Sequence, residues 1–373
     1  MKPDVLIVGA GMIGAACADA LSACGMRVTI VERDAVGSGA TAAGMGHLVA
    51  MDDNAAELAL SSHSLALWKD LVEGQPRRHE YSRCGTIWVA ADDEELEAAR
   101  AKAATMSAHG LECGVIGAQE MYQLEPQLRP GLAGGLLVQG DGLVYPPKSA
   151  RILLARAVAR GATLVMGEVV TLEEGAVLLA DGSRLGAGQI VLAAGTRCLA
   201  LAPELPLRPK KGHVMITDRY PNFIRHQLVE LGYIKSAHAS DGESVAFNLQ
   251  PRPTGQILIG SSRQFDTTDL EAEPSMMARM LKRAVEYAPA LAGLNVLRCW
   301  TGLRAATPDG LPLIGPDLSR RNVWLATGHE GLGITTSLAT AELLAAQMAG
   351  AKAGIDARPY LPNRFEAQGR AYG

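Results

Sequence analysis

The chain has 373 residues, of which 48% are hydrophobic and 20% charged, and its formal net charge at pH 7 is −4. This length exceeds what one ordinary hydrophobic core organises, so we expect two domains. The small net charge creates no bulk field for nucleic acid, and we expect no nucleic-acid partner. The first apolar run is only a few residues long, so we expect neither a transmembrane segment nor a signal peptide, and a cytoplasmic location.

The spacing of the cysteines argues against a metal centre. No two of the six lie closer than seven residues apart: Cys17, Cys24, Cys84, Cys113, Cys198 and Cys299. Without a C-x-x-C pair the chain lacks the pattern for zinc or an iron–sulfur cluster, and we expect no metal. We expect these cysteines to be reduced, small residues of the core.

The N-terminal region predicts a strand, a helix and a second strand. Val5–Val8 form a continuous apolar run, as in a central parallel strand covered on both faces. Ala15–Cys24 follow as a helix that Gly25 ends, and Arg27–Val31 form the next strand.

Three glycines lie between the first strand and the helix in the pattern G-x-G-x-x-G: Gly9, Gly11 and Gly14. The first allows the turn, the second lets the backbone approach a pyrophosphate, and the third lets the helix pack on the strand. Glu32, at the end of the second strand, can accept hydrogen bonds from an adenosine ribose. The pattern predicts a dinucleotide site, and FAD and NAD both use it.

Small residues follow the second strand. The segment Ser38–Gly46 (SGATAAGMG) suits a close approach to a ribityl chain and a pyrophosphate. Further along, Tyr81–Ala91 predict a strand and the charged segment Asp92–His109 predicts a helix. Pro146 and Pro147 then precede an amphipathic helix expected at Lys148–Arg160.

The middle of the chain predicts further strands. Val169 and Val170 lie on one of them and can meet an adenine through their backbone. Gln189–Gly195 (QIVLAAG) form a short buried strand that ends in small residues, where a flat ring system can lie close to the backbone. Three turn-bounded strands, expected at Gly212–Thr217, Glu243–Gln250 and Gly255–Ser262, suggest a sheet over one face of such a ring.

The C-terminal region decides between the two cofactors. Val323–Gly333 (VWLATGHEGLG) predict a strand that enters a glycine-rich turn, and Ile334–Met348 predict a long helix. The N-terminus of that helix can place N–H groups and a positive dipole end near N1 and O2 of a flavin. Together with the small-residue segments, this favours FAD.

Four segments together resemble the D-amino-acid oxidase family of FAD-dependent amine oxidoreductases, which includes glycine oxidase and sarcosine oxidase. They are the glycine pattern with Glu32-Arg33, the S-G-A-T of Ser38–Thr41, TGLRAATPDGLPLIGP at Thr301–Pro316 and the GHEGLGIT of residues 328–335. The resemblance implies an α/β fold, with a doubly wound, Rossmann-like FAD-binding domain and an inserted, β-rich α+β substrate domain. Residues 1–80, 147–206 and 300–373 are then expected in the first domain, and 81–146 and 207–299 in the second.

The segments NLQPRPTGQILIGSSRQFD and GHEGLGITTSLATA are most similar to the flavin-bearing beta subunits of hetero-oligomeric dehydrogenases acting on D-hydroxyproline, L-proline or opines. This resemblance implies that a secondary or D-configured amino acid is oxidised to an imine by hydride transfer to flavin N5. It also implies partner subunits with a second redox centre. The alternative is a self-sufficient amino-acid, sarcosine or glycine oxidase that produces hydrogen peroxide.

The resemblance also implies the roles of four residues. Arg304 is expected to pair with the substrate carboxylate through both arms of its guanidinium. His47 and His329 lie where family members approach the flavin, although His329 can equally be a structural residue that holds its loop. Asn248 stands where glycine oxidase relatives present a tyrosine, and this departure weakens a transfer of glycine specificity.

The cofactor set and a second flavin complete the expectations. The residues expected to bind FAD noncovalently are Gly9, Gly11, Met12, Ile13, Gly14, Glu32, Arg33, Ser38, Ala40, Thr41, Gly44, Met45, Gly46, Val169, Val170, Ala194, Gly195, Gly328, His329, Gly331, Leu332, Gly333 and Ile334. Beta subunits of heterotetrameric sarcosine oxidase carry FMN on a histidine near the helix that here opens with prolines, so a covalent link there is not expected, and an FMN at a subunit interface stays open. Lys210 and Lys211 can hold a phosphate or form a solvated turn.

Overall fold

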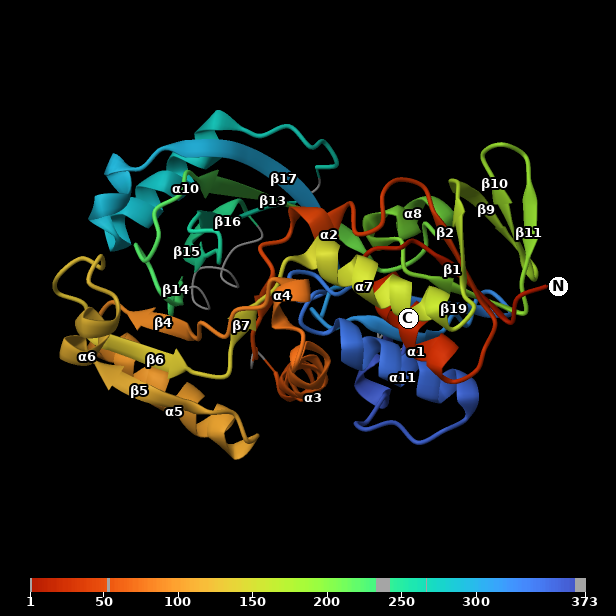
Figure 1. Cartoon of the computed structure of the whole chain (residues 1–373), viewed down its shortest axis with the longest axis horizontal. Helices are drawn as coiled ribbons and strands as arrows, with labels where there is room; N and C mark the ends of the chain where they lie inside the picture. Colours follow the sequence, from red (N-terminus) through yellow and green to blue (C-terminus); the bar gives the residue numbers. More distant parts are fainter. Residues whose placement is uncertain (1, 52–53, 233–241, 266, 366–373) are drawn as a thin grey trace, which may run out of the picture.

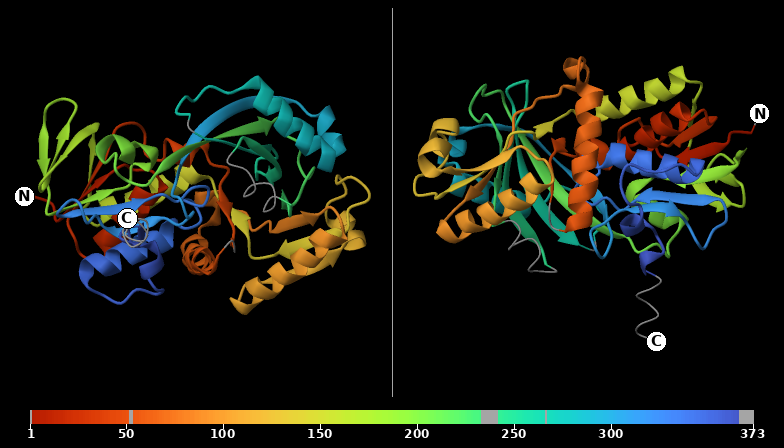
Figure 2. Two further views of the ribbon diagram at one scale, coloured as in Figure 1. Left: turned by 180° about the vertical axis from the view of Figure 1, so that it is seen from behind. Right: turned by 90° about the horizontal axis from the view of Figure 1, so that it is seen from below.

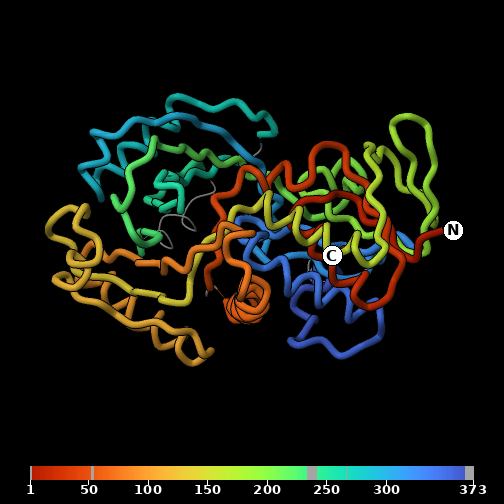
Figure 3. The backbone as a smooth tube through the Cα atoms, in the orientation of Figure 1, coloured from red at the N-terminus to blue at the C-terminus, as the bar shows by residue number. Residues whose placement is uncertain are grey.

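The computed structural model describes residues 2–51, 54–232, 242–265 and 267–365. Two large sheets lie in opposite halves of the elongated molecule, and short elements connect them in the middle (Figure 1). The red N-terminal and blue C-terminal parts of the trace lie side by side in one half, while the orange and cyan segments form the other (Figure 3). Each half therefore combines segments that are far apart in the sequence.

The first half contains a six-stranded sheet in the order β18-β19-β12-β1-β2-β8. Five of its strands are parallel and β18 is an antiparallel edge; the strands are β1 (Val5–Val8), β2 (Val28–Glu32), β8 (Thr163–Met166), β12 (Gln189–Leu192), β18 (Leu313–Pro316) and β19 (Val323–Thr327). All four residues of β1 are buried because both faces of this sheet are covered.

Helices cover one face of this sheet and strands cover the other. The helical layer is α1 (Met12–Ala23), α7 (Pro146–Ala159) and α11 (Ser337–Ala349), with α1 packed between the other two (Figure 2). On the opposite face Leu6 and Val8 pack against an antiparallel layer of β9 (Val169–Glu173), β10 (Ala176–Leu179) and β11 (Arg184–Gly186). The strict alternation along β1 thus divides its side chains between two cores.

The second half contains an eight-stranded sheet in the order β17-β13-β16-β15-β14-β4-β6-β5. Only β14 and β4 pair in parallel; the strands are β4 (Thr86–Ala90), β5 (Cys113–Gly117), β6 (Gly134–Val138), β13 (Arg208–Thr217), β14 (Gln227–Glu230), β15 (Ser244–Pro251), β16 (Ile257–Phe265) and β17 (Val296–Ala306). The helices α5 (Asp93–Ala108), α6 (Ala118–Leu124) and α10 (Pro274–Tyr287) pack against it. α6 and α10 cover the face that carries Ile87 and Val89, whereas α5 packs on the opposite face with Trp88 and Ala90.

Short elements lie between the two halves. The antiparallel pair of β3 (His47–Leu48) and β7 (Gly142–Leu143) joins them, and α2 (Ala40–Ala43) contacts both α7 and β17. The remaining helices are α3 (Ala55–Val72), α4 (Pro76–His79), α8 (Cys198–Leu201), η1 (Gly195–Arg197), η2 (Pro289–Gly293) and η3 (Arg358–Tyr360). No helix within the described ranges combines the length and the apolar character needed to cross a membrane.

The expected α/β fold class is confirmed: a largely parallel, Rossmann-like sheet is combined with a second, β-rich unit. Some boundaries differ. The helix α11 begins at Ser337 rather than at Ile334, because a tight turn precedes it, and β17 runs across the expected boundary at residue 299. Cys24 is exposed, so the expectation that every cysteine is a core residue is wrong for it.

Candidate active site

The turn between β1 and α1 is a close-packed cradle. A Cβ atom on Gly14 would lie 1.9 Å from the carbonyl oxygen of Gly9, so only glycine lets α1 approach β1 this closely. Gly9 has φ +101°, and a Cβ there would lie 2.7 Å from the Ala193 carbonyl oxygen. The backbone that follows β1 therefore lies directly against the end of β12, where Ala194 and Gly195 follow.

The same turn presents donors to an anion. The Met12 N–H donates to Thr41 Oγ1 at 2.9 Å, which ties α2 to the start of α1. Among the described residues, the N–H groups of Gly11 and Ile13 donate to no protein acceptor. Unpaired N–H groups at the positive end of a helix suit a pyrophosphate. The residues in this region fit the cofactor expected from the sequence.

Glu32 lies at the carboxyl end of β2 and is 8% exposed. Its Oε2 accepts from the Ala10 N–H at 2.6 Å and its Oε1 from the Asp34 N–H at 2.8 Å. These bonds fix the carboxylate, and each oxygen keeps a lone pair for a ribose hydroxyl. Arg33 is directed to Asp34 and Glu168 instead, at 2.7 and 3.6 Å.

Other expected cofactor residues fall into two places. Val169, at the start of β9, is 8% exposed, whereas the next residue, Val170, is 43% exposed. The segment from Ser38 to Gly46 passes through α2 and reaches the C-terminal turn, where a Cβ on Gly44 would lie 2.8 Å from Ile334 Cδ1. The structure therefore brings the N-terminal and C-terminal small-residue segments together.

The turn between β19 and α11 presents a second set of donors. Within the described residues, the N–H groups of Gly333, Ile334 and Thr335 donate to no protein acceptor. Gly328, Gly331 and Leu332 belong to the same turn, where the Leu332 N–H donates to the His329 carbonyl oxygen at 3.0 Å. Three neighbouring donors before a helix suit the electron-rich edge of a flavin, as the sequence predicted for this turn.

His47 lies next to this turn, where the Thr335 hydroxyl donates to its carbonyl oxygen at 3.0 Å, and its ring lies inside a group of amide side chains. Its Nδ1 lies 2.8 Å from Gln227 Oε1, and its Nε2 lies 2.8 Å from Gln250 Nε2 and 3.4 Å from Asn248 Nδ2. Gln227 is itself held by Thr86 Oγ1 at 3.2 Å and by the Gly142 carbonyl oxygen at 2.9 Å. We call His47, Gln227, Asn248 and Gln250 the amide cluster.

The amide cluster is electrically neutral and keeps free acceptors. Burial lowers the pKa of His47 to about 4; the hydrogen bond that its ring donates to Gln227 Oε1 opposes this shift, and the charge of Arg304 adds to it. Asn248 Oδ1 and Gln250 Oε1 are buried and have no hydrogen-bond partner among the described residues. Buried amide oxygens normally have a donor, so these two are free to accept one from a ligand.

Arg304 lies on β17, three strands away from Asn248 in the sheet order. Its Nη1 donates to the Ser262 carbonyl oxygen at 3.1 Å, and its guanidinium lies over Gly212, where a Cβ would come within 2.5 Å of Nη2. The absence of a side chain at Gly212 thus makes room for the guanidinium. The structure places Arg304 close enough to the amide cluster for its charge to affect His47.

His329 is not directed toward the amide cluster. Its Nε2 lies 2.9 Å from Thr340 Oγ1 on α11, and its backbone bridges to Ala306. Burial lowers its pKa to about 3, so the ring is neutral at ordinary pH. This geometry agrees with the structural alternative, in which the histidine holds the turn against the helix.

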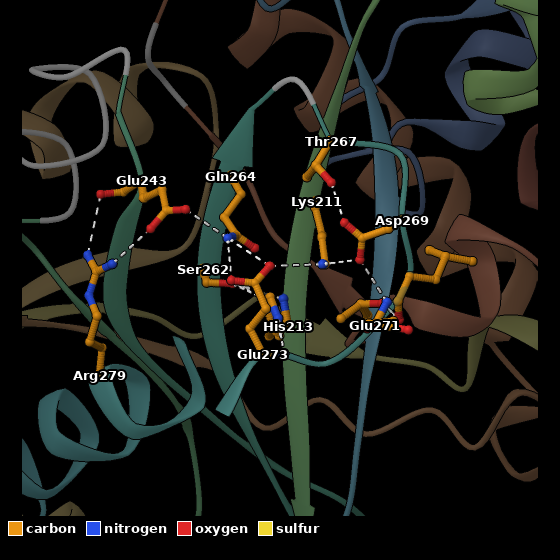
Figure 4. A network of polar contacts seen from close by, with 12 residues as sticks. Lys211, His213, Glu243, Ser262, Gln264, Thr267, Asp269, Glu271, Glu273 and Arg279 are labelled. Atoms are coloured by element: carbon orange, nitrogen blue, oxygen red, sulfur yellow. Dashed lines mark hydrogen bonds and ion pairs between the residues drawn. The ribbon is translucent and has the colours of Figure 1, made fainter. Parts of the chain in front are cut away.

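The solvated turn is wrong for both lysines, because both lie inside strand β13, and the phosphate site is wrong for Lys211. Lys211 is fully buried, and Figure 4 shows its Nζ between Asp269 Oδ1 at 2.7 Å and Glu273 Oε1 at 3.0 Å. Lys210 points to the other face of the sheet, with Nζ 3.4 Å from Glu330 Oε1. Lys211 is thus already neutralised and is no site for a phosphate.

Sequence reasoning overlooked several residues of this region. Gln250 lies two positions after Asn248 on β15, so strand periodicity would have placed it on the same face. Gln227 is 180 residues from His47 along the chain, and no local signal joins the two. No group of His, Cys, Asp and Glu suited to a metal occurs among the described residues.

Comparisons with known proteins agree with this geometry. A model of the DAO family, described as FAD dependent oxidoreductase, matches residues 4–347. Glycine oxidase of Pseudomonas aeruginosa is 31% identical over 97% of this chain and 99% of its own length. An opine oxidase subunit from Rhizobium meliloti is 27% identical over 98% of both chains. The crystal structure of L-proline dehydrogenase from P. horikoshii shares the fold, with a TM-score of 0.89, 22% identity and 98% of each chain covered.

Proposed function

Because this chain belongs to the DAO family of FAD dependent oxidoreductases, we propose that it oxidises a secondary or D-configured amino acid, of the D-hydroxyproline, proline or opine type, to an imine. Bound FAD would supply the redox chemistry by accepting a hydride from the substrate carbon. The substrate nitrogen loses a proton as the C=N bond forms, so the substrate gives up two electrons. The imine then hydrolyses or cyclises.

One observation carries this proposal: a cation, Arg304, and the neutral amide side chains of the amide cluster lie near each other on the same sheet. Arg304 presents a planar fork that matches a carboxylate. The free oxygens of Asn248 and Gln250 can accept from a substrate amine N–H, while the neutral ring of His47 adds no charge that would repel an amine. These residues position and orient, which is what the protein contributes to this type of reaction.

We further propose that the chain is the catalytic beta subunit of a hetero-oligomeric dehydrogenase that passes electrons to a second redox centre. Its similarity to an opine oxidase chain that is named as a subunit supports this. FMN at a subunit interface is part of the same proposal. The alternative is a self-sufficient oxidase that produces hydrogen peroxide, which the 31% identity to a glycine oxidase supports.

The decisive experiment mixes the purified protein anaerobically with isomers of proline, hydroxyproline, sarcosine, glycine and opines while flavin bleaching is followed. Rapid bleaching by one secondary or D-configured amino acid is the expected result. If no amino acid bleaches the flavin while dithionite does, the proposal is wrong. Admitting oxygen then separates the alternatives: stoichiometric peroxide selects the oxidase, and dye reduction without peroxide selects the dehydrogenase.

A further inference from the structure

Three neighbouring strands each place a basic side chain on the face of the eight-stranded sheet that carries Arg304. Lys210 of β13 lies opposite Arg304 of β17 on one side and opposite Phe265 of β16 on the other. Opposite residues share a face, and so do residues two apart on a strand, which adds Arg263 to this face. The Lys210 ammonium lies 5.1 Å from the Phe265 ring centre, as this register requires.

A carboxylate from the other half of the molecule enters this basic group. Glu330 stands in the turn after β19, and its N–H donates to the Ala305 carbonyl oxygen at 2.8 Å. Burial opposes ionisation of the Glu330 carboxyl, but the charges of the three basic residues outweigh burial and hold its pKa below the usual value. The potential at this point is therefore positive enough to stabilise an anion away from bulk water.

The proposed α-carboxylate pairs with the guanidinium fork of Arg304, and the two other basic side chains of this face, Lys210 and Arg263, lie on the next two strands. The contact between Lys210 and Glu330, at 3.4 Å, is longer than a strong charge-assisted hydrogen bond. A second substrate carboxylate can therefore compete for Lys210 at modest cost. The amide cluster lies at the other end of this row of strands from Arg304 and remains to bind the amine nitrogen.

We propose that the substrate carries two carboxylates: one paired with Arg304, and a second, on the nitrogen substituent, bound by Lys210 and Arg263. The class is an N-(carboxyalkyl) amino acid, a secondary amine with an acid on each side of the nitrogen. This inference rests on the proposed function and selects the opine type among its substrates. Glu330 competes with the second carboxylate for Lys210 and so limits its affinity.

The test compares two substrates that differ by one charge. N-(carboxymethyl)alanine and its neutral N-(carbamoylmethyl) analogue have nearly the same shape, and each is mixed anaerobically with the FAD-bound protein. We expect the dicarboxylate to reduce the flavin with an apparent second-order rate constant at least about tenfold larger, as for one extra charge-assisted contact. Equal rate constants, or a preference for the neutral analogue, would overturn the inference.

Variants then assign the preference to residues. Lys210→Gln and Arg263→Gln should each lower the ratio of the two rate constants about tenfold, whereas Glu330→Gln should raise it, because it removes a competing anion. Arg298→Gln is the matched control, since Arg298 lies on the same face of β17, six residues from Arg304 and about 20 Å away. If Lys210→Gln and Arg263→Gln slow both substrates equally, these cations act on the flavin instead, and the second-carboxylate site is refuted.

A binding measurement keeps this inference distinct from the proposed function. Thiodiglycolate has sulfur in place of the amine and gives no imine, and its monoamide lacks one charge. Titration of the flavin absorption spectrum should give a dissociation constant about tenfold lower for the diacid, and the difference should shrink at high salt. A dicarboxylate preference without any flavin reduction by amino acids would contradict the proposed function alone. Reduction by amines without a dicarboxylate preference would contradict only this inference.

Discussion

The hydroxyl of Thr335 donates to the carbonyl oxygen of His47 at 3.0 Å and accepts from the Val49 N–H at 3.2 Å. It therefore joins the glycine-rich turn before α11 to the strand that carries His47 of the amide cluster. Trp68 and Ser64 of α3 hold Thr335 in place by donating to its carbonyl oxygen at 3.0 and 2.5 Å. One side chain thus fixes the position of the turn before α11 relative to His47 of the amide cluster.

Replacing this hydroxyl should have a measurable cost. Thr335→Val keeps the shape but leaves the His47 carbonyl and the Val49 N–H without their partner, and should lower the free energy of unfolding by about 1–3 kcal/mol. Thr335→Ser keeps the hydroxyl and is the control. Urea unfolding of both FAD-bound variants measures the difference. Equal stability of the two variants would mean that the hydroxyl does not couple these segments.

The close approach at Gly14 predicts a loss of cofactor. An alanine Cβ would lie 1.9 Å from the Gly9 carbonyl oxygen, so Gly14→Ala must push α1 away from β1 and disturb the donors at the turn. We expect FAD content to fall at least about tenfold. In Gly114→Ala the new Cβ meets nothing within 4 Å, and FAD content should stay unchanged. Retention of FAD by Gly14→Ala would place the pyrophosphate elsewhere.

Local patterns were sufficient to predict the half of the fold that contains the six-stranded sheet. The buried run of β1, the glycine spacing and Glu32 are encoded within about thirty residues, because strand, turn and helix each have their own short-range signal. The burial of Lys211 had no such signal. Its compensating carboxylates, Asp269 and Glu273, lie 58 and 62 residues away, and only the packing of the loop before α10 brings them to β13.

The same limit applies to the candidate site. Arg304 and Asn248 were predicted as site residues because their segments resemble a family, and resemblance carries tertiary information that a single sequence lacks. Gln227 and Glu330 were missed in this role because each meets its partners only when the two halves of the molecule come together. The predicted start of α11 was wrong by three residues, because the turn before it has a helix-like composition although its N–H groups are unpaired.

Buried neutral histidines predict how stability depends on pH. Burial lowers the pKa from an ordinary value of 6.5 to about 4 in His47 and to about 3 in His329. Because the folded pKa lies below the unfolded one, the unfolded chain takes up protons first as pH falls. Stability is therefore fully present above about pH 6.5 and declines toward pH 4, by at most about 1.4 kcal/mol per pH unit for each histidine.

Urea unfolding from pH 7.5 to 4.5 measures this decline. His329→Gln should make the curve shallower, because one buried group no longer titrates on unfolding. His109→Gln, at an exposed position, should leave the slope as it is. A wild-type curve that is flat across this interval would show that the folded protein accepts these protons without penalty.

Arg304 allows the sharpest prediction about catalysis. If its guanidinium pairs with the substrate carboxylate, Arg304→Ala should keep FAD bound, because the residues expected to hold the pyrophosphate and the ribose lie at the ends of β1 and β2. Loss of the charge-assisted pair should cost about 2–5 kcal/mol, or roughly 30-fold to several thousand-fold in kcat/KM. Arg304→Lys should restore little, since a point charge does not reproduce a two-bond fork.

The control for Arg304 is a substrate without a carboxylate. Pyrrolidine and proline share a ring and an amine, so Arg304→Ala should greatly slow flavin reduction by proline and hardly affect the slow reaction of pyrrolidine. Equal losses on both, with flavin content unchanged, would mean that Arg304 only supports the sheet through its bond to the Ser262 carbonyl oxygen. In that case the carboxylate clamp would have to be sought at Lys210 or Arg263, which lie on the same face.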